Sequence, residues 1–115
     1  MYLFEYQAKE LMRQVGISVL PGAVATTESR AVAAAGELGA GPWAVKAQVL
    51  AGGRAQGFFN NDRHLPGVVF AETSLEVGSV AQSMLGSVLI TPQTTSEGEM
   101  VNAVYIEPAI AVPQE

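Results

Sequence analysis

Cysteine is absent from the 115 residues, and histidine occurs once. Without cysteine the chain has no disulfide, no thiolate metal site and no cysteine nucleophile, which fits a reducing compartment. A single histidine cannot build a histidine-based zinc site. No apolar run approaches the ~20 residues of a membrane span, and the acids Glu5 and Glu10 stand where a secretory signal needs an apolar core. These absences predict a cytoplasmic domain with no membrane association.

Charged residues are also scarce. They make up 15% of the chain, against about a quarter in an average soluble domain. Eleven acids and six bases give a net charge of −5, which disfavours a nucleic-acid binder and leaves room for a small local basic site. Since apolar residues reach 49%, so small a domain is expected to expose neutral surface unless something covers it.

Helical and strand patterns alternate along one domain, residues 1–115. Residues 4–16 predict a helix with one apolar face, which we expect to pack in the core; that face carries Phe4, Ala8, Leu11, Met12 and Val15. Two further helices are predicted, at 28–38 and from Thr73 to Gly86. Strands are predicted at 17–20, 43–50, 67–71, 88–91 and 100–107, with a turn at 21–22 and an irregular stretch at 58–66. This order indicates an α/β (α+β) protein, a mixed sheet with flanking helices.

Lys46 lies inside the apolar strand 43–50 and is the first candidate for a ligand contact. An unpaired ammonium is costly to bury, so the side chain must reach water, pair with an acid or meet an anionic ligand. Alternation places Lys46 on the same face as Ala44 and Gln48. From position alone, a lysine that reaches water at the strand end is the simpler interpretation.

A glycine-rich turn follows that strand, residues 51–57, AGGRAQG. Closely spaced glycines let backbone N–H groups approach a phosphate, and Arg54 adds a positive fork. It is not a Walker A loop, because two phenylalanines follow Gly57 where that motif needs Lys and Ser or Thr, and the G-x-G-x-x-G fingerprint is absent as well. A glycine-rich turn of this kind can also simply connect two strands without contacting a ligand. Glu107, at the end of the last strand, is a carboxylate that could accept ribose hydroxyls or amine protons, or simply be solvated.

Several further segments form a recognisable series. They are residues 4–11 (FEYQAKEL), 39–49 (GAGPWAVKAQV), 51–54 (AGGR), 84–86 (MLG), 91–94 (TPQT) and 101–107 (VNAVYIE). In order, and along essentially the whole chain apart from the loop 55–66, they resemble segments of the β subunits of succinyl-CoA synthetase, an ATP-grasp-type family, such as HEYQAKxL, TxQT and VNxxxxE. The β subunits of malate–CoA ligase share the pattern.

The resemblance implies a function and a set of nucleotide-binding residues. The family couples hydrolysis of a nucleoside triphosphate, ATP or GTP, to acyl-CoA formation through a phosphohistidine on an α subunit, a step of the tricarboxylic acid cycle. The resemblance assigns no catalytic residue and no metal ligand to this chain. The resemblance implies that phosphates lie at Lys46 and under a lid loop formed by Gly53, Arg54 and Ala55. It implies that adenine lies beside Glu107 and Ile110, and ribose at Glu115.

The sequence also departs from the family. The family loop continues GRGKAGG, whereas Arg54 is followed here by AQGFF, the connection to Gly67 is longer, and Leu50 replaces a histidine. The family chain continues far beyond residue 115, where the resemblance places the Mg²⁺ ligands, the second half of the nucleotide site and the subunit interface.

These departures set the expectations for this chain. We expect a truncated lobe with half a nucleotide site, no turnover by itself, and the α subunit and the rest of the β subunit as partners. The alternatives are a non-catalytic binding or assembly module derived from that lobe, and a fragment of a malate–CoA ligase β subunit. Exposed neutral surface predicts a homo-oligomer of the isolated chain.

Overall fold

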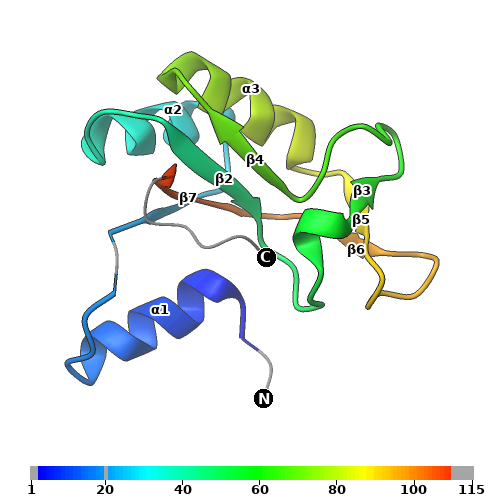
Figure 1. The fold of residues 1–115 in the computed structure, drawn as a ribbon, viewed down its shortest axis with the longest axis horizontal. Helices are drawn as coiled ribbons and strands as arrows, with labels where there is room; N and C mark the ends of the chain where they lie inside the picture. The colour runs from blue at the N-terminus through cyan, green and yellow to red at the C-terminus, as the bar shows by residue number, and fades with distance from the viewer. Residues whose placement is uncertain (1–2, 20, 110–115) are drawn as a thin grey trace.

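The computed structural model describes residues 3–19 and 21–109. A four-stranded sheet forms its centre, and a smaller three-stranded sheet lies at one end (Figure 1). In chain order the elements are α1 (Glu5–Gln14), β1 (Ala23–Ala25), α2 (Glu28–Glu37), β2 (Trp43–Ala47), the short 3-10 helix η1 (Arg54–Gln56), β3 (Phe58–Phe59), β4 (Val68–Ala71), α3 (Ser74–Met84), β5 (Val88–Ile90), β6 (Glu99–Met100) and β7 (Val104–Pro108).

Strand order is β1-β7-β2-β4 in the larger sheet and β3-β5-β6 in the smaller. These elements confirm the α+β class. The expected mixed sheet is corrected in one respect: every strand pair among the described residues is antiparallel. The unit β1-α2-β2 does place two strands in the same direction, but β7 inserts between them and runs antiparallel to both.

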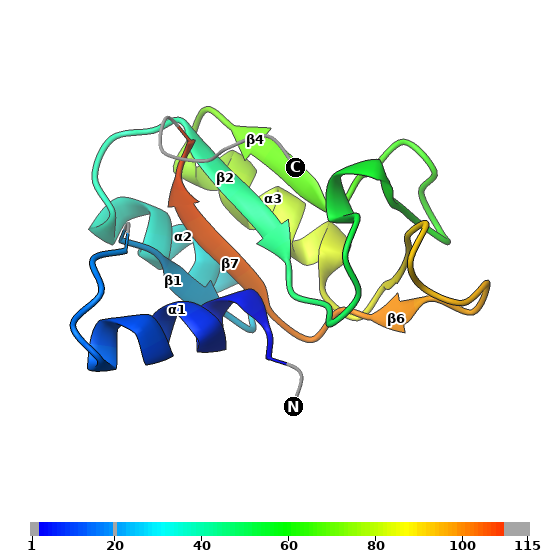
Figure 2. The same cartoon turned by 60° about the horizontal axis from the view of Figure 1, so that its bottom comes forward.

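Helices α2 and α3 cover one face of the larger sheet, and α1 lies on the other face (Figure 2). The predicted capping threonines begin both covering helices: Thr27 Oγ1 accepts a hydrogen bond from Arg30 N at 3.1 Å, and Thr73 Oγ1 from Glu76 N at 3.1 Å. The hydrophobic core fills the space between these helices and the sheet. Its fully buried members include Ala31, Ala34, Ala35, Val45, Ala47, Val77, Ala81, Met84, Val104 and Ile106.

Helix α1 packs the other way round from the prediction. Leu11, Met12 and Val15 are 52%, 41% and 71% exposed, and the helix has no buried residue. The expectation that its apolar face packs in the core is therefore wrong. The physical reason is the sheet face beneath it, which carries charged and hydrogen-bonding side chains, so the helix turns its own charged side inward.

Three smaller differences concern strand boundaries. Residues 17–19 belong to no strand. Two phenylalanines of the stretch expected to be irregular form β3, which pairs with β5. The strand predicted at 100–107 breaks at residues 101–103, because its first part pairs with β5 in the smaller sheet and its second part with β1 and β2 in the larger one. No helix in the described part of the chain has the length and apolar character needed to cross a membrane.

Candidate functional site

The floor of the candidate site is formed by β2 and β7. Lys46 lies directly opposite Tyr105, and Ala44 lies opposite Glu107. Because alternate residues of a strand share a face, Lys46 and Glu107 become diagonal neighbours on the face toward α1. The Nζ of Lys46 is 2.9 Å from Oε1 of Glu107, and the two side chains are 4% and 2% exposed. Lys46 is therefore a buried, paired cation, and the interpretation of a lysine that reaches water is wrong.

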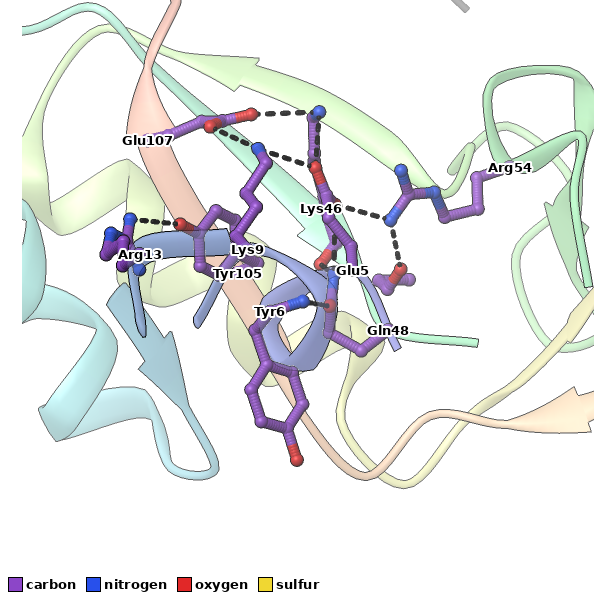
Figure 3. Close-up of polar contacts among 10 residues, drawn as sticks. Glu5, Tyr6, Lys9, Arg13, Lys46, Gln48, Arg54, Tyr105 and Glu107 are labelled. Carbon is purple, nitrogen blue, oxygen red and sulfur yellow. Dashed lines mark hydrogen bonds and ion pairs between the residues drawn. The ribbon is translucent and has the colours of Figure 1, made fainter. Parts of the chain in front are cut away.

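Helix α1 supplies the opposite wall of the site (Figure 3). The Nζ of Lys9 lies 2.8 Å from Oε2 of Glu107 and 2.9 Å from Oε2 of Glu5. That Glu5 oxygen is also 3.0 Å from Nζ of Lys46. The four side chains thus form a closed ring of alternating charge, called the charge ring below: Glu5, Lys46, Glu107 and Lys9. Each charge has two opposite neighbours in the ring, which offsets its loss of hydration.

Arg54 reaches the same cluster from the glycine-rich turn. Its guanidinium Nη1 donates to Oε1 of Glu5 at 2.7 Å and to the carbonyl of Ala47 at 3.2 Å, and its side chain is 11% exposed. Arg54 begins η1, which is entered through Gly53 at φ +80°. This left-handed conformation favours glycine, so Gly53 sets the direction from which the arginine enters the site.

The smaller sheet holds the glycine-rich turn in place. Thr91 donates its hydroxyl to the carbonyl of Gly52 at 2.8 Å, and the Glu99 carboxylate accepts from Leu50 N at 2.8 Å. A Cβ built on Gly57 would lie 2.9 Å from the carbonyl oxygen of Ile90, so the backbone approaches β5 closely at that point. An open hollow of about 400 Å³ remains between the turn and α1, lined in part by Glu5, Gly52, Gly53 and Arg54.

The charge balance of the site favours an anion. Burial acts to raise the pKa of Glu5, but Arg54, Lys9 and Lys46 outweigh it and lower this pKa to about 2. Burial acts to lower the pKa of Lys9, yet its contacts with Glu107 and Glu5 raise it above the usual lysine value. Among residues 3–19 and 21–109, the two lysines and the arginine of the site face two carboxylates, so these five side chains carry one net positive charge beside the backbone of a glycine-rich turn.

The structure brings together three of the residues singled out in the sequence, Lys46, Arg54 and Glu107. Gly53 caps η1 beside them, and Ala55 lies within η1, partly buried. Glu107, which could equally have been a solvated strand end, is buried and paired with two lysines. The other two candidates, Ile110 and Glu115, lie outside the described residues.

Sequence reasoning missed the contribution of α1 and of two hydrogen-bonding residues on the floor. Gln48 accepts from Tyr6 N at 3.0 Å, and the Tyr105 hydroxyl accepts from Arg13 at 3.3 Å. The signal was present as spacing: Glu5, Lys9 and Arg13 recur every four residues, which places them on one side of a helix. On the two strands, polar residues stand two positions apart, at 46 and 48 and at 105 and 107. This spacing marks the face of the sheet that meets the charged side of α1.

Within residues 3–19 and 21–109, no three histidine, aspartate or glutamate side chains gather to hold a metal ion. The two carboxylates of the site, the partly buried Glu5 and the buried Glu107, are both paired with lysines.

Comparison with known proteins places the chain in a family. A family model of the ATP-grasp domain matches residues 2–115. The succinate–CoA ligase [ADP-forming] β subunits of Wolinella succinogenes and Paramagnetospirillum magneticum are each 43% identical, over 115 and 116 residues, and that of Paracoccus denitrificans is 43% identical over 117. The alignments cover all of this chain and 27%, 29% and 30% of those relatives. The chain thus spans less than a third of their length, and it belongs to the ATP-grasp domain family.

Proposed function

We propose that this chain binds the phosphates of a nucleoside triphosphate, ATP or GTP, as the nucleotide-binding part of a succinate–CoA ligase β subunit. One observation carries the proposal: Lys46 and Arg54 converge on a single carboxylate, that of Glu5, at distances of 3.0 and 2.7 Å. Phosphate oxygens accept from the same donors that bind a carboxylate oxygen, with similar geometry. The pair therefore forms an anion-binding corner beside the glycine-rich turn.

Each residue has a proposed role. Lys46 and Arg54 donate to phosphate oxygens, and the backbone from Gly53 to Ala55 closes over them. From the resemblance to the family, we propose that adenine lies beside Glu107 and Ile110 and ribose at Glu115. The buried contact between Glu107 and Lys46 at 2.9 Å supports a second role for Glu107, since it fixes the direction of the ammonium.

The overall reaction is proposed from the relatives. The matched relatives bear the name succinate–CoA ligase [ADP-forming] subunit β, and we propose that this chain acts with an α subunit in the same acid–thiol ligation in the cytoplasm. Because the chain spans 27–30% of those relatives' length, we propose that it holds half of the nucleotide site and does not turn over alone. Malate is the alternative acid. A coupled assay with either acid, run with this chain alone and then with the α subunit and the remainder of a β subunit added, separates these proposals.

A second candidate function is an assembly module, and the exposed face of α1 favours it. Leu3, Ala8, Leu11, Met12 and Val15 line an apolar hollow of about 290 Å³ on that face. A helix whose apolar face points to solvent and whose charged face is turned inward usually has a partner on the apolar side. We propose that two copies of the chain associate through this face.

Titration calorimetry tests the nucleotide site. ATP with Mg²⁺ should bind the chain, and Lys46→Met should weaken binding by about tenfold or more, as expected for a lost charge-assisted contact. Arg30→Met is the matched control: Arg30 pairs with Glu37 on the surface, outside the site. Equal binding by the Lys46→Met chain and the unmodified chain would contradict the proposal. Parallel titrations with GTP decide the choice of base.

A further inference from the structure

With nucleotide phosphates taken to bind at Lys46 and Arg54, as proposed above, we propose that Glu5 is a built-in competitor for them. Its carboxylate stands in the position of a phosphate oxygen pair, and a nucleotide binds by displacing it. Helix α1 is then a displaceable cover over the phosphate end of the site, and Glu5 sets the affinity of the chain for polyphosphate ligands.

The contacts of Glu5 are those of a bound anion. Oε1 accepts from Arg54 at 2.7 Å, and Oε2 accepts from Lys46 at 3.0 Å and from Lys9 at 2.9 Å. Gln48 adds a longer contact at 3.4 Å. Three cations thus surround one carboxylate (Figure 3). Glu5 lies on α1, whereas Lys46 and Arg54, the cations that the sequence links to phosphate, lie on β2 and η1.

A phosphate cannot share this position with Glu5. Both groups are anionic acceptors, and a close pair of like charges in a partly buried site is strongly repulsive. Protonation does not relieve the conflict near neutral pH, since Arg54, Lys9 and Lys46 hold the pKa of Glu5 at about 2 against the opposing effect of burial. In the described part of the chain, the charged groups that face Glu5 are Lys9 on its own helix, Lys46 on β2 and Arg54 on η1.

Helix α1 is built to move. It has no buried residue, and polar groups hold its charged side to the sheet and to η1. These contacts include the ion pairs of Glu5 and Lys9, the bond from Tyr6 N to Gln48 at 3.0 Å and the bond from Arg13 to Tyr105 at 3.3 Å. The Lys9 ammonium also lies 4.9 Å from the centre of the Tyr105 ring. Polar contacts of this kind exchange readily for contacts with water or with another ligand. Lys46 keeps Glu107 as a partner when Glu5 leaves, so the ammonium stays in place for the incoming phosphate.

Substitution of Glu5 by its neutral isostere gives the test. Calorimetry would compare the unmodified chain, Glu5→Gln and Glu10→Gln with three probes: ATP with Mg²⁺, tripolyphosphate and adenosine. Glu10 lies on the same helix, is 61% exposed and makes a 3.6 Å pair with Arg13, so its substitution changes the net charge equally without touching the site. We expect Glu5→Gln to bind ATP and tripolyphosphate about tenfold more tightly, with no gain for adenosine and none in Glu10→Gln.

The outcomes separate this inference from the function on which it rests. Tighter tripolyphosphate binding by Glu5→Gln with no binding of ATP supports the displaced carboxylate and refutes the nucleotide site. ATP binding that Glu5→Gln leaves unchanged or weakens refutes the competitor and leaves the nucleotide site standing. If no chain binds any phosphate probe, both are wrong.

A second measurement uses the unmodified chain and does not depend on the variant folding. Amide hydrogen exchange would be followed in α1 with and without saturating tripolyphosphate. Displacement of Glu5 removes contacts that hold the helix to the sheet, so the amide of Tyr6 and those after it should exchange faster with the ligand bound. Unchanged or slower exchange in α1, with the ligand bound, would overturn the proposal.

Discussion

Replacing Lys46 by methionine tests whether the charge ring stabilises the fold. The substitution keeps the length of the side chain and removes one cation from between Glu5 and Glu107, which lie 3.0 and 2.9 Å away. Removing one partner of a buried ion pair costs about 3–5 kcal/mol when the other charge is left unpaired. Here Lys9 still contacts both carboxylates, at 2.9 and 2.8 Å, so a smaller loss of about 2–3 kcal/mol is expected.

Urea unfolding followed by the fluorescence of Trp43 measures the effect. With a slope of about 1–3 kcal/mol per molar urea, a loss of this size lowers the midpoint by about 0.7–3 M. Arg30→Met, which breaks the exposed pair with Glu37, should leave the midpoint unchanged. The double variant Lys46→Met with Glu107→Met should recover part of the loss, because no buried carboxylate is then left short of a partner. A midpoint for Lys46→Met equal to or above that of the unmodified chain would refute the reasoning.

Three further predictions follow from other parts of the structure. The pKa of Glu5 in the folded chain lies below its usual value of 4.5, so the ionised side chain stabilises the fold fully above pH 4.5 and loses this effect as the pH falls toward 2. Urea unfolding at several pH values should show a weaker acid dependence for Glu5→Gln. Sedimentation should show that Leu11→Asp abolishes self-association, whereas Leu75→Asp, at an exposed position on α3, does not. Gly57→Ala should lower stability by about 1–3 kcal/mol in urea unfolding, because its Cβ meets the Ile90 carbonyl.

Local patterns predicted the helices and their caps. Thr27 and Thr73 begin the two covering helices as expected, and their side chains make the capping bonds. These signals succeed because a cap depends on atoms within a few residues of the chain. The strand around Lys46 was predicted for a similar reason, since its apolar side chains are buried on both faces of the sheet.

The orientation of α1 could not be read from its own pattern. Its apolar residues predicted a buried face, but the face that a helix buries depends on the surface that it meets. That surface is made by residues some 40 and 100 positions away, near Lys46 and Glu107. Nonlocal pairing likewise decided that β7 separates β1 from β2, and it brought Glu5, Lys46 and Glu107 together. Glu5 and Lys9 therefore joined the site only through the fold, whereas Lys46, Arg54 and Glu107 were already candidates in the sequence.

Amide NMR during titration with ATP and Mg²⁺ tests the central claim most directly. If the phosphates bind at the anion-binding corner, the largest shifts should occur at the amides of Gly53, Arg54 and Ala55 and at Lys46. The same titration of Lys46→Met should lose them. Shifts confined to another part of the chain, such as the hollow between Arg13 and Arg30, or shifts that survive Lys46→Met unchanged, would contradict the account.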